Sequence, residues 1–252
     1  METRRDFLKT LSTGAAATVI GGIEINAYAD RPDSLMKELL VKKVNTKADA
    51  PWDEVQKAIE TADWNIIDIV NWSDYPYRPK VEFRIVYGDS ALLLQYRVKE
   101  QSVRAVAAAD NGEVWKDSCV EMFIKPGSDE LYYNFEFNCI GFCLLAVGSS
   151  REGRELATPE VLSPIRRKTS LERQPFDERK GETEWELSAV IPFACFFKHS
   201  DYSPDGKTVR ANFYKCGDDL TVPHFLSWNP IKAEKPDFHR PECFGAVKFR
   251  AH

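Results

Sequence analysis

The chain predicts an all-β fold, an antiparallel β-sandwich or jelly roll with one short helix near its N-terminus. Apolar residues recur at every second position in several segments, clusters of Gly, Pro, Asp and Ser separate these segments, and helical periodicity is scarce. Short alternating segments of this kind are typical of sandwiches, in which each strand buries one face. The length of 252 residues allows one such domain, which we expect at residues 50–252.

Two features are expected before the first strand of the sandwich. Residues 30–49 are polar and lysine-rich, and we interpret them as a lead-in segment with a short helix at Ser34 to Leu40. Pro51 to Ile59 has Pro in a first helical turn and apolar residues on one helical face. This second segment predicts the short helix that packs on the sandwich.

The strands follow as segments with a period of two. Val81 to Tyr87 and Leu92 to Val98 alternate apolar and polar residues, and a turn at Gly88-Asp89-Ser90 joins them. The segment Ser150 to Lys180 is rich in Arg and Glu and predicts a long irregular excursion from the sandwich. Further strands are expected at Cys119 to Ile124, Tyr132 to Asn138, Trp185 to Ile191, Val209 to Cys216 and Gly245 to Phe249.

The first residues predict export. Thr3-Arg4-Arg5-Asp6-Phe7-Leu8-Lys9 is a twin-arginine pattern, an apolar run from Leu11 to Ile23 follows it, and Ala27-Tyr28-Ala29 is a small-x-small cleavage site. We therefore expect residues 1–29 to be a twin-arginine signal peptide and the protein to be periplasmic or extracellular. The apolar run is too short to be a stable membrane span.

Charge and cysteine content exclude some classes of protein. The formal net charge of −5 argues against a nucleic-acid partner, whose phosphates need a basic face. The six cysteines form no C-x-x-C motif, so neither a zinc ribbon nor a redox pair is indicated. Cys119, Cys139, Cys195 and Cys216 lie in apolar runs and are expected to be free buried thiols, with a Cys139–Cys143 or a Cys119–Cys216 bridge as the alternative.

Two tryptophans at strand edges carry the functional signal. Trp115 comes just before the strand that holds Glu121, and Trp228 occupies a second loop that could face it. The C–H face of a pyranose ring packs on indole, and its hydroxyls need hydrogen-bonding partners. These residues therefore predict a sugar-binding site. The alternatives are a core position, as expected for Trp64, Trp72 and Trp185, and a buried structural ion pair between Glu121 and Arg210.

Several motifs together resemble the family 9 carbohydrate-binding modules found on xylanases and in exported proteins of glycan-degrading bacteria. They are the run Trp115 to Ile124, the strand Tyr132 to Asn138, Arg210-Ala211-Asn212-Phe213, and Ser227-Trp228 followed by Pro241 to Gly245. The resemblance implies a jelly-roll sandwich in which two tryptophans hold a terminal sugar unit and polar side chains bind its hydroxyls. It also implies a structural calcium ion.

By position, the resemblance assigns roles to five residues. Trp115 and Trp228 would be the two aromatic faces, and Glu121 would be the carboxylate that accepts hydrogen bonds from sugar hydroxyls. Asn134 and Asn212 fall where family members also place polar side chains.

Glu136 departs from the family pattern, which has an arginine on the strand after the carboxylate. A carboxylate only accepts hydrogen bonds and a guanidinium only donates them, so the two cannot serve a ligand in the same way. Arg97 and Arg210, on polar strand faces, are the candidates for the missing donors. Asp110-Asn111-Gly112 and Cys216-Gly217-Asp218-Asp219 offer oxygen ligands for calcium, although neither completes a ligand set.

Three classes of function compete. The first is an exported non-catalytic protein that binds a mono-, oligo- or polysaccharide during glycan breakdown, alongside partner glycoside hydrolases; one binding fold then accounts for the whole chain. The second is a glycoside hydrolase, or an accessory subunit of one, that uses Glu121 and Glu136 as acid and nucleophile or base. The third is a haem or redox module, for which Met122 and His239 are the only pair of candidate axial ligands.

Overall fold

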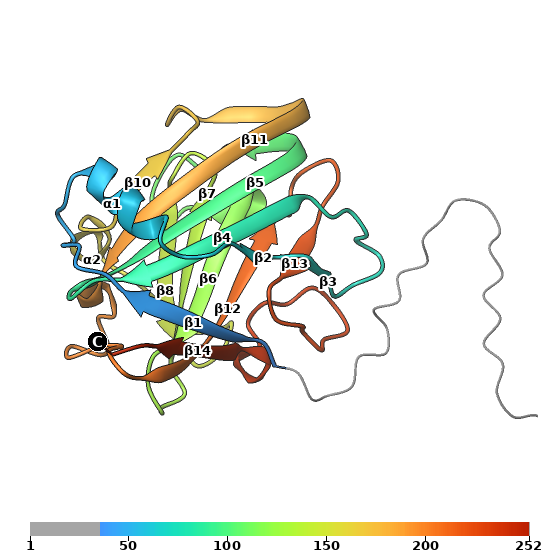
Figure 1. Cartoon of the computed structure of the whole chain (residues 1–252). Helices are drawn as coiled ribbons and strands as arrows, with labels where there is room; N and C mark the ends of the chain where they lie inside the picture. Colours follow the sequence, from blue (N-terminus) through green and yellow to red (C-terminus); the bar gives the residue numbers. More distant parts are fainter. Residues whose placement is uncertain (1–35, 252) are drawn as a thin grey trace, which may run out of the picture. The chain divides into compact units, whose positions relative to one another are not determined.

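Two twisted β-sheets lie face to face in the computed structural model, which describes residues 36–251 (Figure 1). Sheet A has the order β14 (Gly245–Phe249), β12 (Thr208–Cys216), β6 (Cys119–Lys125), β7 (Tyr132–Asn138), β8 (Cys143–Gly148) and β9 (Glu155–Leu156). Sheet B has the order β10 (Arg166–Thr169), β11 (Phe176–Pro192), β5 (Ala91–Ala105) and β4 (Lys80–Tyr87). The predicted signal peptide lies outside the described residues.

Shorter elements complete the two layers. Strands β13 (Phe225–Ser227) and β3 (Ile69–Val70) extend sheet A beside β12, and β2 (Asn65–Ile66) pairs with β4. The helical elements are α1 (Trp52–Ile59), α2 (Pro159–Leu162) and the short 3₁₀ turns η1 (Val114–Lys116), η2 (Phe193–Cys195) and η3 (Pro241–Cys243). The predicted all-β sandwich and its short N-terminal helix are thereby confirmed.

Strand β1 (Glu38–Lys43) joins the two sheets and corrects the expected lead-in segment. The structure describes the expected helix only from residue 36 onward, and it forms no helix there. Leu39 is buried whereas Leu40 is 44% exposed, and this alternation of buried and exposed residues is that of a strand. Residues Glu38 to Val41 pair with β14 and the last two residues with β4, both in parallel. The sandwich is therefore mixed rather than wholly antiparallel, and it begins inside the segment expected to precede it.

The longest strands extend beyond the predicted limits. β11 begins at Phe176, inside the expected excursion, and pairs with β5 along a ribbon that reaches Ala105. Most residues of β11 before Trp185 are exposed, so neither face needs apolar side chains and the period of two disappears. Backbone pairing and surface ion pairs, rather than apolar burial, hold this half of the strand. The excursion also contains β9, α2 and β10.

Two apolar clusters lie on opposite faces of sheet A. The first fills the space between the sheets, where Phe83 of sheet B stacks on Phe213 of sheet A at 3.8 Å between ring centroids. The second lies on the outer face of sheet A, under loops that include Trp72 and Phe238. Trp72 and Trp185 are buried as expected, whereas Trp64 is half-buried. The outer cluster matters for function because the covering loops shape a cavity there.

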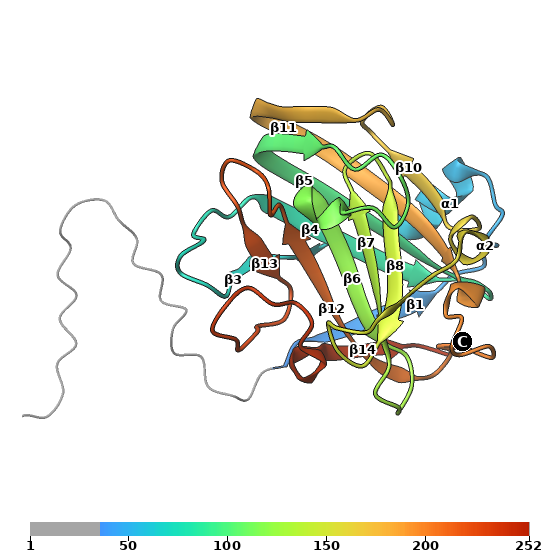
Figure 2. The same cartoon turned by 180° about the vertical axis from the view of Figure 1, so that it is seen from behind.

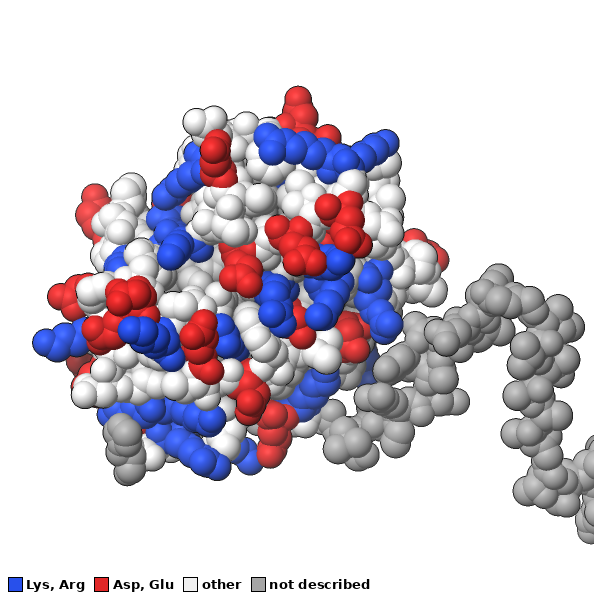
Figure 3. Space-filling view, turned by 45° about the horizontal axis from the view of Figure 1, so that its top comes forward, with Lys and Arg blue, Asp and Glu red and all other residues white. Residues whose placement is uncertain are grey.

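Charged side chains of both signs mix on the surface. On the face seen in Figure 3, Lys and Arg alternate with Asp and Glu and form no patch of a single sign. Lys99, for example, lies 2.7 Å from Glu182 and 3.1 Å from Glu184. None of the helices within residues 36–251 has the length and apolar character needed to cross a membrane.

Candidate functional site

The register of sheet A brings two carboxylates side by side on its outer face. Glu121 of β6 is directly opposite Glu136 of β7, and Tyr214 of β12 is opposite Glu121 on the other side. Figure 2 looks at this side of the sheet, where β8, β7, β6 and β12 lie next to one another. The predicted alternation of β6 is confirmed, because Val120 and Met122 belong to the cluster between the sheets.

A cavity of about 360 Å³ opens above these carboxylates. Both glutamates line it, and loops supply its remaining walls. The aromatic part of the wall is formed by Trp115, Phe123, Phe225 and Phe238, and the polar part by Arg151, Glu152, Arg154, Asp218, Asp237 and His239. An aromatic wall with a few directed polar groups is what a small polar ligand requires.

Trp115 is fixed at this cavity by the residues that follow it. It lies half-buried in η1, and the fully buried Asp117 anchors this turn. The Asp117 carboxylate accepts hydrogen bonds from Arg104 Nη1 at 2.7 Å, from Asn138 Nδ2 at 3.0 Å and from two backbone N–H groups. The Trp115 carbonyl accepts a further bond from the backbone of Asp218. Charge-assisted bonds of this kind hold the indole in one place.

Glu121 lies at the floor of the cavity and is 2% exposed. Its Oε1 accepts hydrogen bonds from Cys216 Sγ at 3.2 Å and Cys119 Sγ at 3.8 Å. Oε2 has no hydrogen-bond partner among the described residues. Burial, and then the charge of Glu136, raises the pKa of Glu121 well above its ordinary value. The alternative ion pair with Arg210 does not form.

Glu136 is 3% exposed and is held by two neighbours. Asn134 Nδ2 donates to its Oε1 at 2.7 Å, and Arg154 Nη1 lies 3.8 Å from the same oxygen. Burial raises the pKa of Glu136 to about 7, although Asn134 and Arg154 both favour the charged form. Asn134, a predicted site residue, therefore lies beside the cavity and orients Glu136.

Arg154 is a donor that lines the cavity, where neither Arg97 nor Arg210 is found. Its Nη1 is buried and has no hydrogen-bond partner, while its Nε donates to the carbonyl of Arg151 at 2.8 Å. Gly148 makes room for this arginine, because a Cβ there would lie 2.8 Å from Arg154 Cγ. A buried, unpaired donor is costly, so Arg154 is poised for a ligand. The sequence did not mark it because it lies in the charged excursion.

Arg97 and Arg210 do not line the cavity, which corrects their predicted role. Arg97 belongs to sheet B, where it donates to Glu82 at 2.8 Å and lies over the ring of Trp64 at 4.4 Å. Arg210 donates to the carbonyl of Phe244 at 2.8 Å. The hollow of about 160 Å³ beside Arg97 has only charged side chains in its lining, and it offers no aromatic face.

Trp228 and Asn212 are likewise placed elsewhere. Trp228 is 3% exposed and lies between the sheets, edge-on to Phe83 at 6.2 Å and to Phe213 at 5.7 Å. Asn212 is fully buried, and its Oδ1 accepts bonds from the backbone of Phe213 and Asn229. Trp228 therefore does not face Trp115, because its loop turns into the core. The other aromatic side chains of the cavity wall are Phe123, Phe225 and Phe238.

His239 lines the cavity as a neutral base. Burial, and then the charges of Arg154 and Arg151, lowers its pKa to about 3, and its Nδ1 lies 2.9 Å from the hydroxyl of Tyr132. Met122 is on the opposite face of sheet A, in the cluster between the sheets. The two residues cannot be axial ligands of one haem, so the structure gives that alternative no site.

The Asp110 and Asn111 side chains, which were candidates for calcium, make hydrogen bonds to other parts of the chain. The Asp110 carboxylate accepts bonds from Arg167 at 2.6 and 3.0 Å, and the Asn111 side chain bonds to backbone groups of Leu145 and Ala157. Burial, and then Asp219, raises the pKa of Asp218 to about 6. Within residues 36–251, the one cluster of three residues with metal-ligating atoms is Cys119, Glu121 and Cys216, which lacks the oxygen ligands that calcium requires.

The fold and the cavity define a β-sandwich ligand-binding module, with its site on the outer face of one sheet. The chain belongs to carbohydrate-binding family 9, whose family model matches residues 53–249. The sequence resemblance is thereby confirmed.

Solved structures agree with this membership. A crystal structure from Bacteroides uniformis, of a protein to which carbohydrate binding is ascribed, is 51% identical, covers 84% of this chain and 99% of its own, and has a TM-score of 0.81. A family 9 module from Caldicellulosiruptor kristjanssonii in complex with glucose shares the fold at 16% identity, with 86% and 97% coverage and a TM-score of 0.54. The same bacterium's module in complex with cellotriose gives the same identity and TM-score, with 86% and 95% coverage. No curated protein matches the chain.

Proposed function

We propose that this protein binds a sugar without cleaving it, and that the ligand is a glucose-type unit, free or at the end of a short glucan. The family supports the ligand class, as do the distant modules solved with glucose and cellotriose. A cavity of about 360 Å³ is of the size that holds a small ligand.

The observation that carries the proposal is the arrangement of Trp115, Glu136 and Arg154 around one cavity. Trp115 gives a flat face for the C–H side of the ring. Glu136 accepts hydrogen bonds from hydroxyls, and Oε2 of Glu121 accepts or, when protonated, donates one. Nη1 of Arg154, which has no hydrogen-bond partner among the described residues, donates another. Phe225, half-buried in the cavity wall, is our candidate for the second aromatic face.

Calorimetric titration of the purified protein with glucose and cellotriose tests the proposal. We expect Trp115→Ala to lower the affinity by at least about thirtyfold, since loss of an aromatic anchor costs ~2 kcal/mol or more. Trp64→Ala is the matched control, because Trp64 is also half-buried but lies beside Arg97 of sheet B, and its affinity should equal that of wild type. Equal losses in both variants, or no binding by wild type, would contradict the proposal.

A hydrolase remains the second candidate because Glu121 and Glu136 form a close pair of carboxylates with raised pKa values. Both project from neighbouring strands on one floor, whereas an acid and its partner normally flank the scissile bond. We therefore expect no release of reducing sugar from cellotriose. Release that disappears in Glu136→Gln would establish the hydrolase instead.

We also propose that the protein is exported and acts in glycan breakdown with partner glycoside hydrolases. The twin-arginine pattern and the Ala27-Tyr28-Ala29 site support export. We expect an N-terminus at Asp30 in exported protein.

A further inference from the structure

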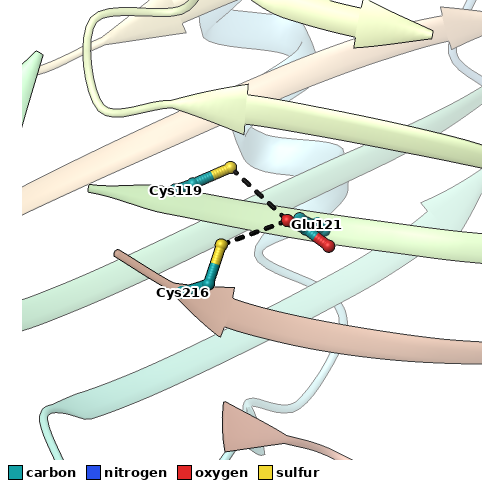
Figure 4. A group of neighbouring side chains, drawn as sticks. All are labelled: Cys119, Glu121 and Cys216. Carbon is teal, nitrogen blue, oxygen red and sulfur yellow. Dashed lines mark hydrogen bonds between the residues drawn. The ribbon is translucent and has the colours of Figure 1, made fainter. Parts of the chain in front are cut away.

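Two cysteines and a glutamate meet at the floor of the cavity (Figure 4). Cys119 of β6 and Cys216 of β12 are directly opposite each other in the register, and both thiols point at Glu121 Oε1. One ligand atom from each of the three residues lies within 4.8 Å of the other two. None of the three residues is more than 2% exposed.

The spacing of these atoms fits a tetrahedral metal ion. With Zn–S bonds of about 2.3 Å and Zn–O bonds of about 2.0–2.2 Å, tetrahedral angles place sulfur and oxygen roughly 3.5 Å apart. The two sulfur–oxygen distances here are 3.2 and 3.8 Å. Small movements of three side chains would therefore place all three atoms around one ion.

The local charge also favours a cation. Glu121 is buried beside Glu136, and the donors to its Oε1 are two thiols, which are weak hydrogen-bond donors. Arg154, which lines the same cavity, forms its ion pair with Glu136 rather than with Glu121. A buried carboxylate is normally paired with a cation or bound to a metal. Two thiolates and a carboxylate would give a zinc-type ion the soft and anionic ligands it prefers.

We infer that Cys119, Cys216 and Glu121 form a binding site for a divalent zinc-type ion at the floor of the cavity. The ion displaces one proton from each thiol and any proton that Glu121 holds, and it forms two metal–sulfur bonds and one metal–oxygen bond, so at least two protons are released for each ion bound. Because Glu121 and Cys216 line the cavity, the fourth coordination position of the tetrahedral ion would face the cavity. The site needs no sugar for its assembly.

Cobalt(II) titration of the reduced full-length protein tests this site, because tetrahedral thiolate-bound Co²⁺ absorbs strongly in the visible and near-ultraviolet. We expect one Co²⁺ per chain, a thiolate-to-cobalt band that Zn²⁺ removes, and release of at least two protons. Cys119→Ser and Cys216→Ser should abolish the band. Glu121→Gln should weaken affinity by more than the ~10–100-fold cost of losing a group that only orients a ligand.

Cys143→Ser is the matched control, since Cys143 is a buried thiol on the same sheet that bonds to the carbonyl of Leu144. It should keep the band. A second readout is the melting temperature of wild type, which should rise with Zn²⁺ and should not rise in Cys216→Ser. The inference fails if reduced wild type gives no band, if the band survives loss of either cysteine, or if a Cys119–Cys216 disulfide persists under phosphine reductant. Titration of the metal-free protein with glucose measures sugar binding independently of metal binding. Failure of the metal site can therefore be distinguished from failure of the proposed sugar-binding function.

Discussion

At the scale of single residues, two indoles that both lie next to strands occupy opposite environments. Trp115 is held at the cavity by Asp117, and Trp228 lies between the sheets, where Gly245 allows it to approach the backbone closely. A Cβ at Gly245 would lie 2.5 Å from Trp228 Cζ3. The same residue type therefore lines a cavity in one place and packs between the sheets in the other.

Trp228→Ala should destabilise the fold by about 3–5 kcal/mol, because it leaves a large cavity between the sheets. Trp115→Ala should change the free energy of unfolding much less. Urea unfolding followed by fluorescence or circular dichroism measures both changes. If Trp228→Ala unfolded like wild type but lost sugar affinity, the core position of this indole would be wrong.

Glu136 should make stability fall as pH rises from about 4.5 to about 7. Its pKa in the folded protein is about 7, above the ordinary 4.5, so between these values the unfolded chain loses the proton that the folded chain retains. The contribution is complete below the ordinary pKa and is lost by about pH 7, up to about 3 kcal/mol. Unfolding in urea at several pH values should show this slope, Glu136→Gln should flatten it, and Glu54→Gln, at an exposed position, should not.

Sequence reasoning placed three of the residues that line the cavity, and Asn134 beside it, in the candidate site, and it missed others for a physical reason. Strand alternation fixes the face on which Glu121, Asn134 and Glu136 lie. The hydrogen bonds that the Asp117 carboxylate accepts fix the turn that carries Trp115. Arg154 comes from a loop whose path depends on tertiary contacts such as the one at Gly148. The direction of the Trp228 loop depends on such contacts too, and no periodic pattern encodes it.

At the scale of elements, β1 shows how a strand can be hidden in a polar segment. Only alternate residues of β1 are buried, and lysines occupy its last two positions. This composition also suits the exposed helix that we expected at its start. The partners of β1 are β14 and β4, which come from distant parts of the chain, so local sequence could not reveal the pairing.

Neighbouring leucines of β1 provide a matched test of this pairing. Leu39→Ala should cost about 2–5 kcal/mol of stability because Leu39 is 7% exposed. Leu40→Ala should change stability by less than about 0.5 kcal/mol because Leu40 is 44% exposed. Equal costs measured by urea unfolding would argue against a strand with alternating faces.

At the scale of the whole molecule, the described fold begins, along the sequence, after the proposed signal peptide. The compact unit runs from Met36 to His252, and β1 begins at Glu38, after the expected cleavage at Ala29. Every strand and every cavity residue therefore belongs to the part that processing would retain. Removal of residues 1–29 should then leave both the sandwich and its cavity unchanged.

Changing Arg4 and Arg5 together to Lys should consequently alter where the protein is found and leave its folding and binding as they are. Lysine keeps the charge but removes the paired guanidinium groups of the export signal. We expect the variant to stay in the cytoplasm with its first 29 residues attached, as fractionation and mass spectrometry would show. Its melting temperature and glucose affinity should match those of processed wild type, because the described strands and the cavity lie after residue 35. Processing of the variant at the normal site would refute the export signal, and a lower melting temperature of the unprocessed chain would refute the independence of the folded unit.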